Sequence, residues 1–397
     1  MRLVLASLHL SWLGGATTYL LTVAPALQRL GHTVTLYSPD PGSTAEIARA
    51  RGIEVVSDED GLPDDCDAVL VQDTVLAFEL GARLRAPQVF VSHGAELDLA
   101  VPPQIDEAVA AVVAMNDRVA ARVAALATRP KCVRLRQPID IERFYQQGPP
   151  RERPAEVLLL GNYLRGQRRA VVTDVCEQLG LRYTQLGRDG KMSPEPVSAI
   201  GSADIVIGYG RSILEAMACG RAAYVLDHLG ADGWVTAQSY RELERDGFTG
   251  THSGTEPTHE RLRADLMAYD PGMGIVNESL IVSHHASFAH ARELSDLLMS
   301  VAGEPRRKLD SGRELARLAR MQWHADWRFH ELERDVQAMR VELREQERRT
   351  MEAEQRAAAL ASTLRWRAAQ RILAPIDRVR ARVRETRRRL LGRRGSD

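Results

Sequence analysis

Cysteine is scarce in this chain. The four cysteines among 397 residues are Cys66, Cys132, Cys176 and Cys219, and none of them forms a C-x-x-C pair. This spacing lacks the common zinc-binding patterns, and a chain of this length has no need of a disulfide framework. We therefore expect a protein of a reducing compartment with no metal site. Long apolar runs are also missing. A membrane-spanning helix needs about eighteen consecutive apolar residues, and no stretch of this chain is that long.

The N-terminal segment MRLVLASLHLSWLGG has a weak likeness to a secretion signal. Its apolar run is broken by Ser7, His9 and Ser11, and it leads directly into an amphipathic helical pattern. We interpret the segment as a buried first strand followed by a helix, not as a signal peptide.

Net charge is absent as well, because 53 basic and 53 acidic side chains cancel. The cancellation is uneven, since residues 365–397 hold twelve arginines and only three acidic residues. Such asymmetry indicates a basic tail with an anionic partner, attached to a more acidic protein body.

Apolar segments alternate with helical patterns from the N-terminus onward. Strands are predicted at 3–6, 33–37, 53–56, 68–71, 89–92, 111–114 and 133–136, with helices such as 16–30 and 117–126 between them. Strands and helices that alternate with short connections predict a parallel, doubly wound sheet. The Pro-rich polar stretch QGPPRERP, residues 147–154, then interrupts the pattern and is the best candidate for a linker.

The strand–glycine–helix order starts again after that stretch. Strands are predicted at 157–160, 182–186, 205–207 and 222–226, helices at 168–179 and 212–218, and further helix over 256–298. We therefore expect an α/β protein with two Rossmann-like domains, residues 1–148 and 155–305. A chain of 397 residues has room for an appendage beyond these two domains.

Residues 325–364 carry a different pattern, in which apolar or small side chains recur at alternating spacings of three and four. The positions are 329, 332, 336, 339, 343, 346, 350, 353, 357, 360 and 364. This heptad repeat predicts a coiled coil through which the chain associates with itself, although Gln346 and Thr350 weaken the seam. A long solvated helix packed on the protein body is the alternative.

The segment ADIVIGYGRSILEAMACG, residues 203–220, joins a predicted strand to a helix through Gly208-Tyr209-Gly210. Glycine turns that lead into a helix form phosphate sites in α/β proteins, because the backbone approaches the ligand closely and the first helix amides are unpaired. Gly14 and Gly15 stand in the same place after the first strand. Neither turn has the G-x-G-x-x-G fingerprint, so a dinucleotide-dependent oxidoreductase is the least favoured alternative.

This segment resembles the nucleotide-sugar signature of retaining, family 4-like glycosyltransferases of the GT-B architecture, which reads E-G-F-G-x-x-x-x-E-A-M-A-C-G. Two more segments support the resemblance, LQRLGHTV at 27–34 and QPIDIERF at 137–144, and they occur in the order found in that family. The resemblance covers residues 1–300 or so. It implies two Rossmann-like domains facing each other, followed here by the coiled-coil helix and the basic tail.

The resemblance also implies roles for individual residues. It places Gly14 and Gly15 against the donor diphosphate and Glu215 on the ribose hydroxyls. It makes His93 the catalytic residue beside the transferred sugar, and His93 also directly follows a predicted parallel strand, where ligands bind. The other donor-binding positions are Gly161, Arg165, Arg168, Gly208, Gly210, Arg211 and Ser212.

Two positions depart from the family pattern. Ile207 replaces the first Glu of the signature, which contacts the donor sugar, and Asn162 replaces an Arg that contacts the donor phosphates. The nucleotide half of the expected site is therefore better preserved than the sugar half. Arg165 and Arg168 are the candidates to offset the lost phosphate contact.

These observations predict a glycosyltransferase that moves a sugar from a nucleotide-activated donor to a glycan or lipid-linked acceptor, in cell-surface polysaccharide synthesis. The nucleotide sugar is a co-substrate, and neither a cofactor nor a metal is expected if helix amides and an arginine stabilise the leaving diphosphate. The alternative is a degenerate transferase that serves as a nucleotide-sugar-binding or coiled-coil assembly subunit, which Ile207 and Asn162 favour. We expect the protein in the cytoplasm, peripheral on the inner face of the membrane.

The last residues, 365–397, interleave their arginines with Trp366 and aliphatic side chains. The segment from Ser362 resembles the Ser-Trp-Arg-x-x-x-Pro-type ends that follow coiled coils in some bacterial polysaccharide enzymes. Arginines mixed with a Trp and aliphatic residues are suited to an anionic membrane surface. Nucleic acid and plain solvent are the alternative surroundings, and no base-reading fold accompanies the charges.

Overall fold

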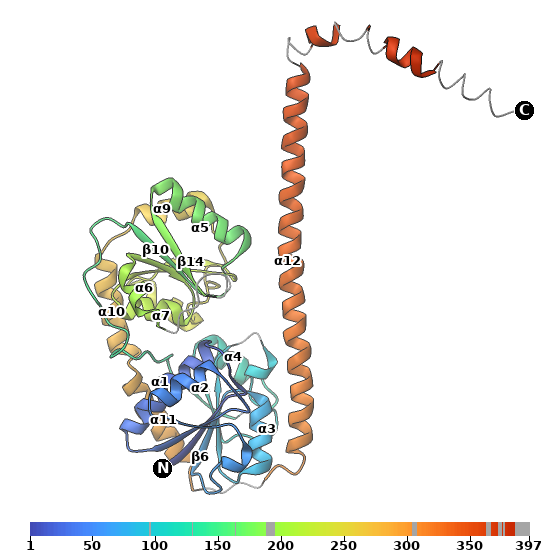
Figure 1. Cartoon of the computed structure of the whole chain (residues 1–397). Coiled ribbons are helices and arrows are strands. Elements are labelled where there is room, and N and C mark those ends of the chain that lie inside the picture. The colour runs from blue at the N-terminus through green and yellow to red at the C-terminus, as the bar shows by residue number, and fades with distance from the viewer. Residues whose placement is uncertain are drawn as a thin grey trace, which may run out of the picture. The chain divides into compact units, whose positions relative to one another are not determined.

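The computed structural model describes residues 1–94, 97–128, 130–162, 164–187, 195–303, 308–362, 367–371, 375 and 378–385. Backbone contacts divide the chain into two units, Met1–Phe329 and His330–Asp397, which are described one at a time. The first unit contains two separate sheets of mainly parallel strands, each flanked by helices (Figure 1). The predicted α/β fold class is confirmed.

Seven parallel strands form the first sheet, in the spatial order β5-β3-β1-β6-β7-β8-β9. Their bounds are β1 Arg2–Ala6, β3 Thr33–Tyr37, β5 Glu54–Val56, β6 Ala68–Val71, β7 Gln88–Ser92, β8 Ala111–Ala114 and β9 Lys131–Arg134. A separate parallel pair consists of β2 (His9–Leu10) and β4 (Asp40–Pro41). The strands lie where the apolar segments predict them, except that β9 starts two residues earlier than predicted.

Helices cover both faces of this sheet, which explains why its strands are apolar at nearly every position. Successive side chains of a strand point to opposite faces. Leu3 and Leu5 therefore pack with α1 (Gly15–Arg29) and α2 (Ser43–Ala50), whereas Val4 packs with α3 (Thr74–Arg83) and α4 (Asp117–Ala124). Two single-turn 3-10 helices, η1 (Glu59–Gly61) and η2 (Asp98–Ala100), lie in the connections.

Five strands form the second sheet, in the order β11-β10-β12-β13-β14. The bounds are β10 Glu156–Leu160, β11 Arg182–Leu186, β12 Ile205–Gly208, β13 Ala222–Leu226 and β14 Ala231–Trp234. The last strand is antiparallel to β13, which the sequence pattern does not predict. The flanking helices are α5 Gly166–Leu179, α6 Val197–Ser202, α7 Arg211–Ala218, α8 Tyr240–Asp246, α9 His259–Met267 and α10 Gly272–His284.

The helix α11 (Ser287–Val301) belongs structurally with the first sheet, although the sequence division assigns residues 155–305 to the second domain. Its side chains Ala291, Leu294 and Leu298 are buried in the same core as α1. The chain therefore returns to the first domain after α10. It crosses at Ile139 and Ala286, which form an isolated parallel bridge between the outgoing and returning segments.

A helix of 51 residues, α12 (Gly312–Ser362), follows. Its first turns belong to the first unit, where Ala316 is buried and Trp323 packs at the edge of the core that α3 shares. The remainder, from His330, belongs to the second unit. No helix in the described ranges is long and apolar enough to cross a membrane.

Candidate functional site

Both sheets reverse their winding direction at one place. In the first sheet β1 lies between β3 and β6, and in the second sheet β10 lies between β11 and β12. Ligands of doubly wound proteins bind outside the carboxyl ends of the two strands at such a reversal. These ends carry Ser7 and Gln72 in the first sheet, and Gly161 and Tyr209 in the second. The predicted site residues lie around them.

The loop after β1 carries Gly14 and Gly15 to the start of α1. Gly14 is the N-cap residue, and its amide donates to the hydroxyl of Thr17 over 2.9 Å. A Cβ at Gly14 would lie 2.5 Å from the ring of Trp12, so a larger residue would displace that half-exposed indole. A Cβ at Gly15 would meet nothing within 4 Å. The backbone at Gly15 is therefore open to an approaching ligand.

His93 directly follows β7 and is half-buried beside two buried polar rings, Tyr19 and His290. Its Nε2–H donates to Oε1 of Gln72 over 2.5 Å, and its ring meets that of Tyr19 edge to face at 5.0 Å between centroids. The hydroxyl of Tyr19 donates to Nε2 of His290 over 2.9 Å. His290 in turn donates from Nδ1 to the carbonyl of Arg136. Gln72 and Tyr19 thus orient His93 directly, and His290 in turn holds Tyr19.

Burial, with a smaller effect from the positive charge of Arg211, lowers the pKa of His93 to about 3. The imidazole is therefore neutral at physiological pH. With its Nε2 proton donated to Gln72, the lone pair of Nδ1 is the group that His93 can offer to a ligand hydroxyl. It supplies no positive charge to a phosphate.

Glycines also line the reversal point of the second sheet. A Cβ at Gly208 would lie 2.4 Å from the carbonyl oxygen of Leu160 on the neighbouring strand, and a Cβ at Gly161 would lie 3.0 Å from Oδ2 of Asp227. Gly210 has φ +55°, a left-handed conformation that favours glycine, and it begins α7. The close approach of three strand ends therefore explains why the motif needs small residues there.

Arg211 and Glu215 form a buried ion pair on α7. Nε of Arg211 donates to Oε1 of Glu215 over 2.8 Å, and each side chain is 10% exposed. The other guanidinium nitrogens donate to the carbonyl of Pro138 and to the hydroxyl of Thr22 on α1, both over 2.9 Å. Burial raises the pKa of Glu215 and lowers that of Arg211, and their mutual attraction opposes both shifts.

This pair brings His93, Arg211 and Glu215 into one neighbourhood. Thr22, which accepts from Arg211, lies one turn along α1 from Tyr19, which contacts His93. Glu215 accepts from Arg211 through Oε1, so its Oε2 can accept a hydrogen bond from a ligand. The sequence motif placed Glu215 correctly beside the predicted turn, but it did not predict that Arg211 would share the carboxylate.

The two predicted phosphate-binding arginines lie in different surroundings. Arg168 is engaged with Glu256, with Nε to Oε2 at 2.9 Å, and also donates to the carbonyl of His228. Arg165 is the N-cap residue of α5. Ser212, in the first turn of α7, has its Cβ 3.3 Å from where a Gly208 Cβ would lie. Of the predicted cations, Arg211 is the one that the structure places beside both His93 and Glu215.

Two buried carboxylates lie near the same strand ends: Asp73, which sequence reasoning missed, and Asp227, which it considered as a replacement sugar contact. Asp73 caps α3, accepting from the amide of Leu76, and also accepts from the amide of Leu8; burial raises its pKa to about 6. Asp227 is fully buried at the end of β13, and no described residue bonds its Oδ2. A carboxylate directly after an apolar strand is the signal that predicts such residues.

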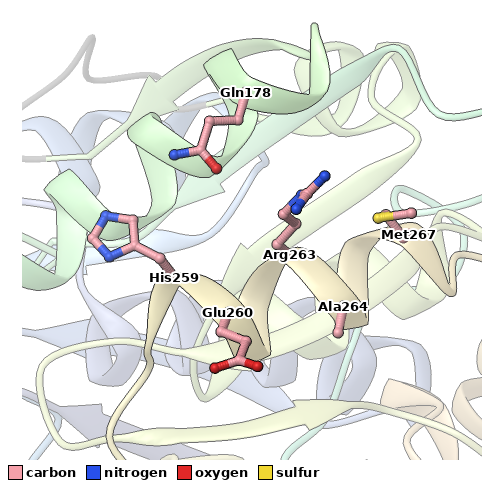
Figure 2. Close-up of a pocket in the computed structure, with 6 residues that line it drawn as sticks. All are labelled: Gln178, His259, Glu260, Arg263, Ala264 and Met267. Atoms are coloured by element: carbon pink, nitrogen blue, oxygen red, sulfur yellow. The ribbon is translucent and has the colours of Figure 1, made fainter.

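No group of three or more His, Cys, Asp and Glu side chains suited to a metal ion occurs in the described ranges. Two surface hollows lie elsewhere. Figure 2 shows the first, of about 350 Å³ between α5 and α9, with Gln178, His259 and Glu260 among its lining residues. The second, of about 240 Å³, lies between α3 and the first turns of α12. Neither lining includes a predicted site residue.

No protein-family model and no curated protein matches the chain. Its structure, however, is similar to those of solved glycosyltransferases. HepE of Anabaena, solved with UDP and glucose, has a TM-score of 0.55 at 13% identity, over 76% of this chain and 100% of HepE. This chain has the GT-B fold.

Two further structures show the same fold. An alpha-glucosyltransferase solved with UDP and a 13-mer DNA has a TM-score of 0.51 at 13% identity, over 75% of this chain and 99% of its own. WaaG, a glycosyltransferase of lipopolysaccharide biosynthesis, has a TM-score of 0.51 at 12% identity, over 75% and 99%. At this identity the likeness establishes the architecture of the first unit, and the chemistry rests on the site residues.

Proposed function

We propose that this protein is a glycosyltransferase that uses a nucleotide-activated sugar. The observation that carries the proposal is the shared neighbourhood of a neutral His93 and the Arg211–Glu215 pair, which lies at strand ends of two sheets in the GT-B fold. HepE, of the same fold, is solved with UDP-glucose and with UDP and glucose, which supports a nucleotide-sugar donor for this chain too.

Each side chain has a role suited to its surroundings. Glu215 accepts from the ribose hydroxyls through Oε2, since a carboxylate is an acceptor at both oxygens. The open backbone at Gly15 and the first amides of α1, together with the Arg211 amide at the start of α7, receive the diphosphate, at helix ends that favour negative charge. His93, with its Nδ1 lone pair, orients a hydroxyl of the transferred sugar. Stabilising the leaving diphosphate with amides and Arg211 needs no metal.

A second function deserves a test because Ile207 is fully buried in the core that α5 and α9 cover. An apolar side chain in the sheet makes no sugar contact. The site would then bind a nucleotide sugar without transferring it, as a sensor or assembly subunit. The two functions share donor binding and differ in turnover.

Donor binding is tested by titrating UDP-glucose, and a panel of other nucleotide sugars, into wild type, Glu215→Gln and Glu260→Ala. Glu215→Gln removes the charge on the ribose acceptor while keeping the size of the side chain, and should weaken binding by about tenfold, roughly 1.5 kcal/mol. Glu260→Ala, on the hollow of Figure 2, is the control and should bind like wild type. Equal affinities for all three proteins would remove Glu215 from the site.

Turnover separates the two functions. His93→Ala should keep the donor affinity within about twofold and abolish release of free nucleotide, because its ring faces the sugar side. Wild type that binds a donor yet releases no nucleotide with any glycan or lipid-linked acceptor would favour the sensor. Transfer to either class of acceptor, in the assembly of cell-surface polysaccharide, is part of the proposal.

We also propose that the second unit joins two copies of the chain in a parallel coiled coil. The apolar seam residues of this unit, Leu332, Val336, Met339, Leu343 and Leu360, are all exposed, as is Phe329 just before it. In a parallel pair, a residue that flanks the seam in one copy lies beside the residue five positions later in the other copy. Arg328 therefore faces Glu333, Asp335 faces Arg340, and Arg349 faces Glu354 of the second copy. Three of these pairs attract, and only Glu342 with Glu347 repels.

The basic tail is proposed to bind an anionic membrane surface from the cytoplasmic side. Of this tail the structure describes 367–371, 375 and 378–385, where Val379 and Val383 are exposed beside arginines. The predicted anchor Trp366 and the arginines at 387–389 lie outside the described residues. Each basic residue near anionic lipid contributes about 1 kcal/mol.

A further inference from the structure

Four aromatic rings meet where the loop after β1 contacts α12. The rings of His9 and Trp323 lie 5.8 Å apart between centroids, those of Trp323 and Trp327 5.8 Å, and those of Trp327 and Trp12 6.5 Å. Trp12 is 44% exposed, and both α12 indoles are partly exposed. All four residues belong to the first unit. We call this group the aromatic shelf.

The shelf carries a polar group at one end. Oδ2 of Asp40 accepts from Nδ1 of His9 over 2.7 Å and from the hydroxyl of Ser11 over 2.8 Å. Both bonds fall on the same oxygen, and no described residue bonds Oδ1, on a side chain that is 49% exposed. The hydrogen bond from His9 holds the pKa of Asp40 below its ordinary value, so the carboxylate is ionised. Oδ1 remains an acceptor on this half-exposed side chain, which is joined to the indoles through the ring of His9.

Indoles next to an exposed carboxylate have the chemistry of a pyranose site. One face of a pyranose presents C–H groups that stack on an aromatic ring, while its hydroxyls donate to a carboxylate. A membrane surface is less suited to the shelf, because inserting these indoles would desolvate the charge of Asp40. Nothing in the mechanism proposed above uses any of these residues.

The position of Trp12 connects the shelf to the proposed donor site. The far end of its ring lies against Gly14, 2.5 Å from where a Cβ at that residue would be. Its carbonyl accepts from Thr17 in the first turn of α1 and from Thr44 in α2. The ring of Trp12 therefore contacts Gly14, the residue that precedes the open backbone of Gly15.

We propose that the aromatic shelf, formed by Trp12, Trp323, Trp327 and Asp40, is the binding site for the saccharide part of the acceptor. The inference rests on the proposed transferase function. It assigns to the first turns of α12 a role in recognising the acceptor, so that a helix outside both Rossmann-like sheets completes the site.

The first test measures saccharide binding without any donor, by quenching of tryptophan fluorescence on the full-length protein. The probes are maltotriose, cellotriose, chitotriose and mannotriose. At least one of them should quench wild type, and Trp12→Ala and Trp327→Ala should each weaken its binding by about 2- to 12-fold. Asp40→Asn should weaken it as well while leaving the rings in place. Met321→Ala, an exposed apolar side chain on the same helix, is the control and should bind like wild type.

The outcomes distinguish the shelf from the donor site. Loss of saccharide binding in the shelf variants, with UDP-glucose affinity unchanged, supports the inference. Saccharide binding that persists in Trp12→Ala and Trp327→Ala, or no quenching by any of the four probes, overturns it. If these variants instead lose binding to phosphatidylcholine–phosphatidylglycerol vesicles, the shelf is a membrane contact and the inference is wrong. Failure of wild type to bind any nucleotide sugar would refute the proposed function, while shelf binding would remain measurable.

Discussion

Replacing Arg211 by methionine is expected to destabilise the protein strongly. The guanidinium has three partners, Glu215, Thr22 and the carbonyl of Pro138, and both members of the ion pair are nearly inaccessible to solvent. Removing one member of a buried ion pair leaves the other charge uncompensated, which costs about 3–5 kcal/mol. Methionine fills most of the volume, so the cost measures charge and hydrogen bonding, and not a cavity.

The measurement is a double-mutant cycle by urea denaturation with Arg211→Met, Glu215→Leu and the double variant. Replacing a buried pair by apolar side chains is often neutral, so the double variant should lose at least about 2 kcal/mol less than the sum of the single variants. Arg348→Met breaks an exposed pair with Glu352 at the same i,i+4 spacing and should cost about 0.5 kcal/mol or less. Additive losses, or a cost for Arg211→Met no larger than for Arg348→Met, would refute the buried-pair reasoning.

Three further predictions concern pH, self-association and the tail. Burial lowers the pKa of His285 to about 3 and of His290 to about 4. As the pH falls below 6.5, these histidines therefore gain protons in the unfolded chain while they stay neutral in the folded protein. Each should therefore cost about 2 kcal/mol of stability between about pH 7 and pH 5, and a flat stability profile would contradict their burial as neutral rings. Light scattering should give the mass of a dimer for wild type and of a monomer for the double variant Leu332→Lys/Leu343→Lys. The control Met351→Lys, outside the seam, should stay dimeric. A monomeric wild type would rule out the coiled coil. Removing residues 362–397 should abolish sedimentation with anionic vesicles at low salt and leave UDP-glucose binding unchanged, whereas equal binding to neutral vesicles would exclude an electrostatic anchor.

The sequence predicted the strands well because the central strands, buried on both faces, are mainly apolar, and apolar runs are visible without any tertiary information. It predicted less of what depends on packing between distant segments. The return of α11 to the core of α1 is an example, because its amphipathic pattern says only that one face is buried. Strand β14 is another, since an antiparallel edge breaks the alternation from which the sheet was inferred.

In the site, too, local features were predictable from the sequence, whereas contacts between distant segments were not. Gly208 and Gly210 were predictable because a tight approach and a left-handed backbone leave few alternatives to glycine. The environment of His93 was not, because Gln72, Tyr19 and His290 come from three other segments. The four-residue spacing of Arg211 and Glu215 allowed an ion pair on one face of α7. Only the fold showed that this face is buried against α1 and the segment before Ile139.

The central claim is that strand ends of both sheets bind one nucleotide sugar. Hydrogen exchange of backbone amides, with and without a saturating nucleotide sugar chosen by titration, tests it most directly, because the proposed ligand contacts are amides at two helix starts. The account predicts slower exchange in the donor complex at both Gly15–Thr17 in α1 and Arg211 in α7, with no change at His259–Glu260 in α9. Protection confined to one of the two helix starts, or to α9, would contradict the claim.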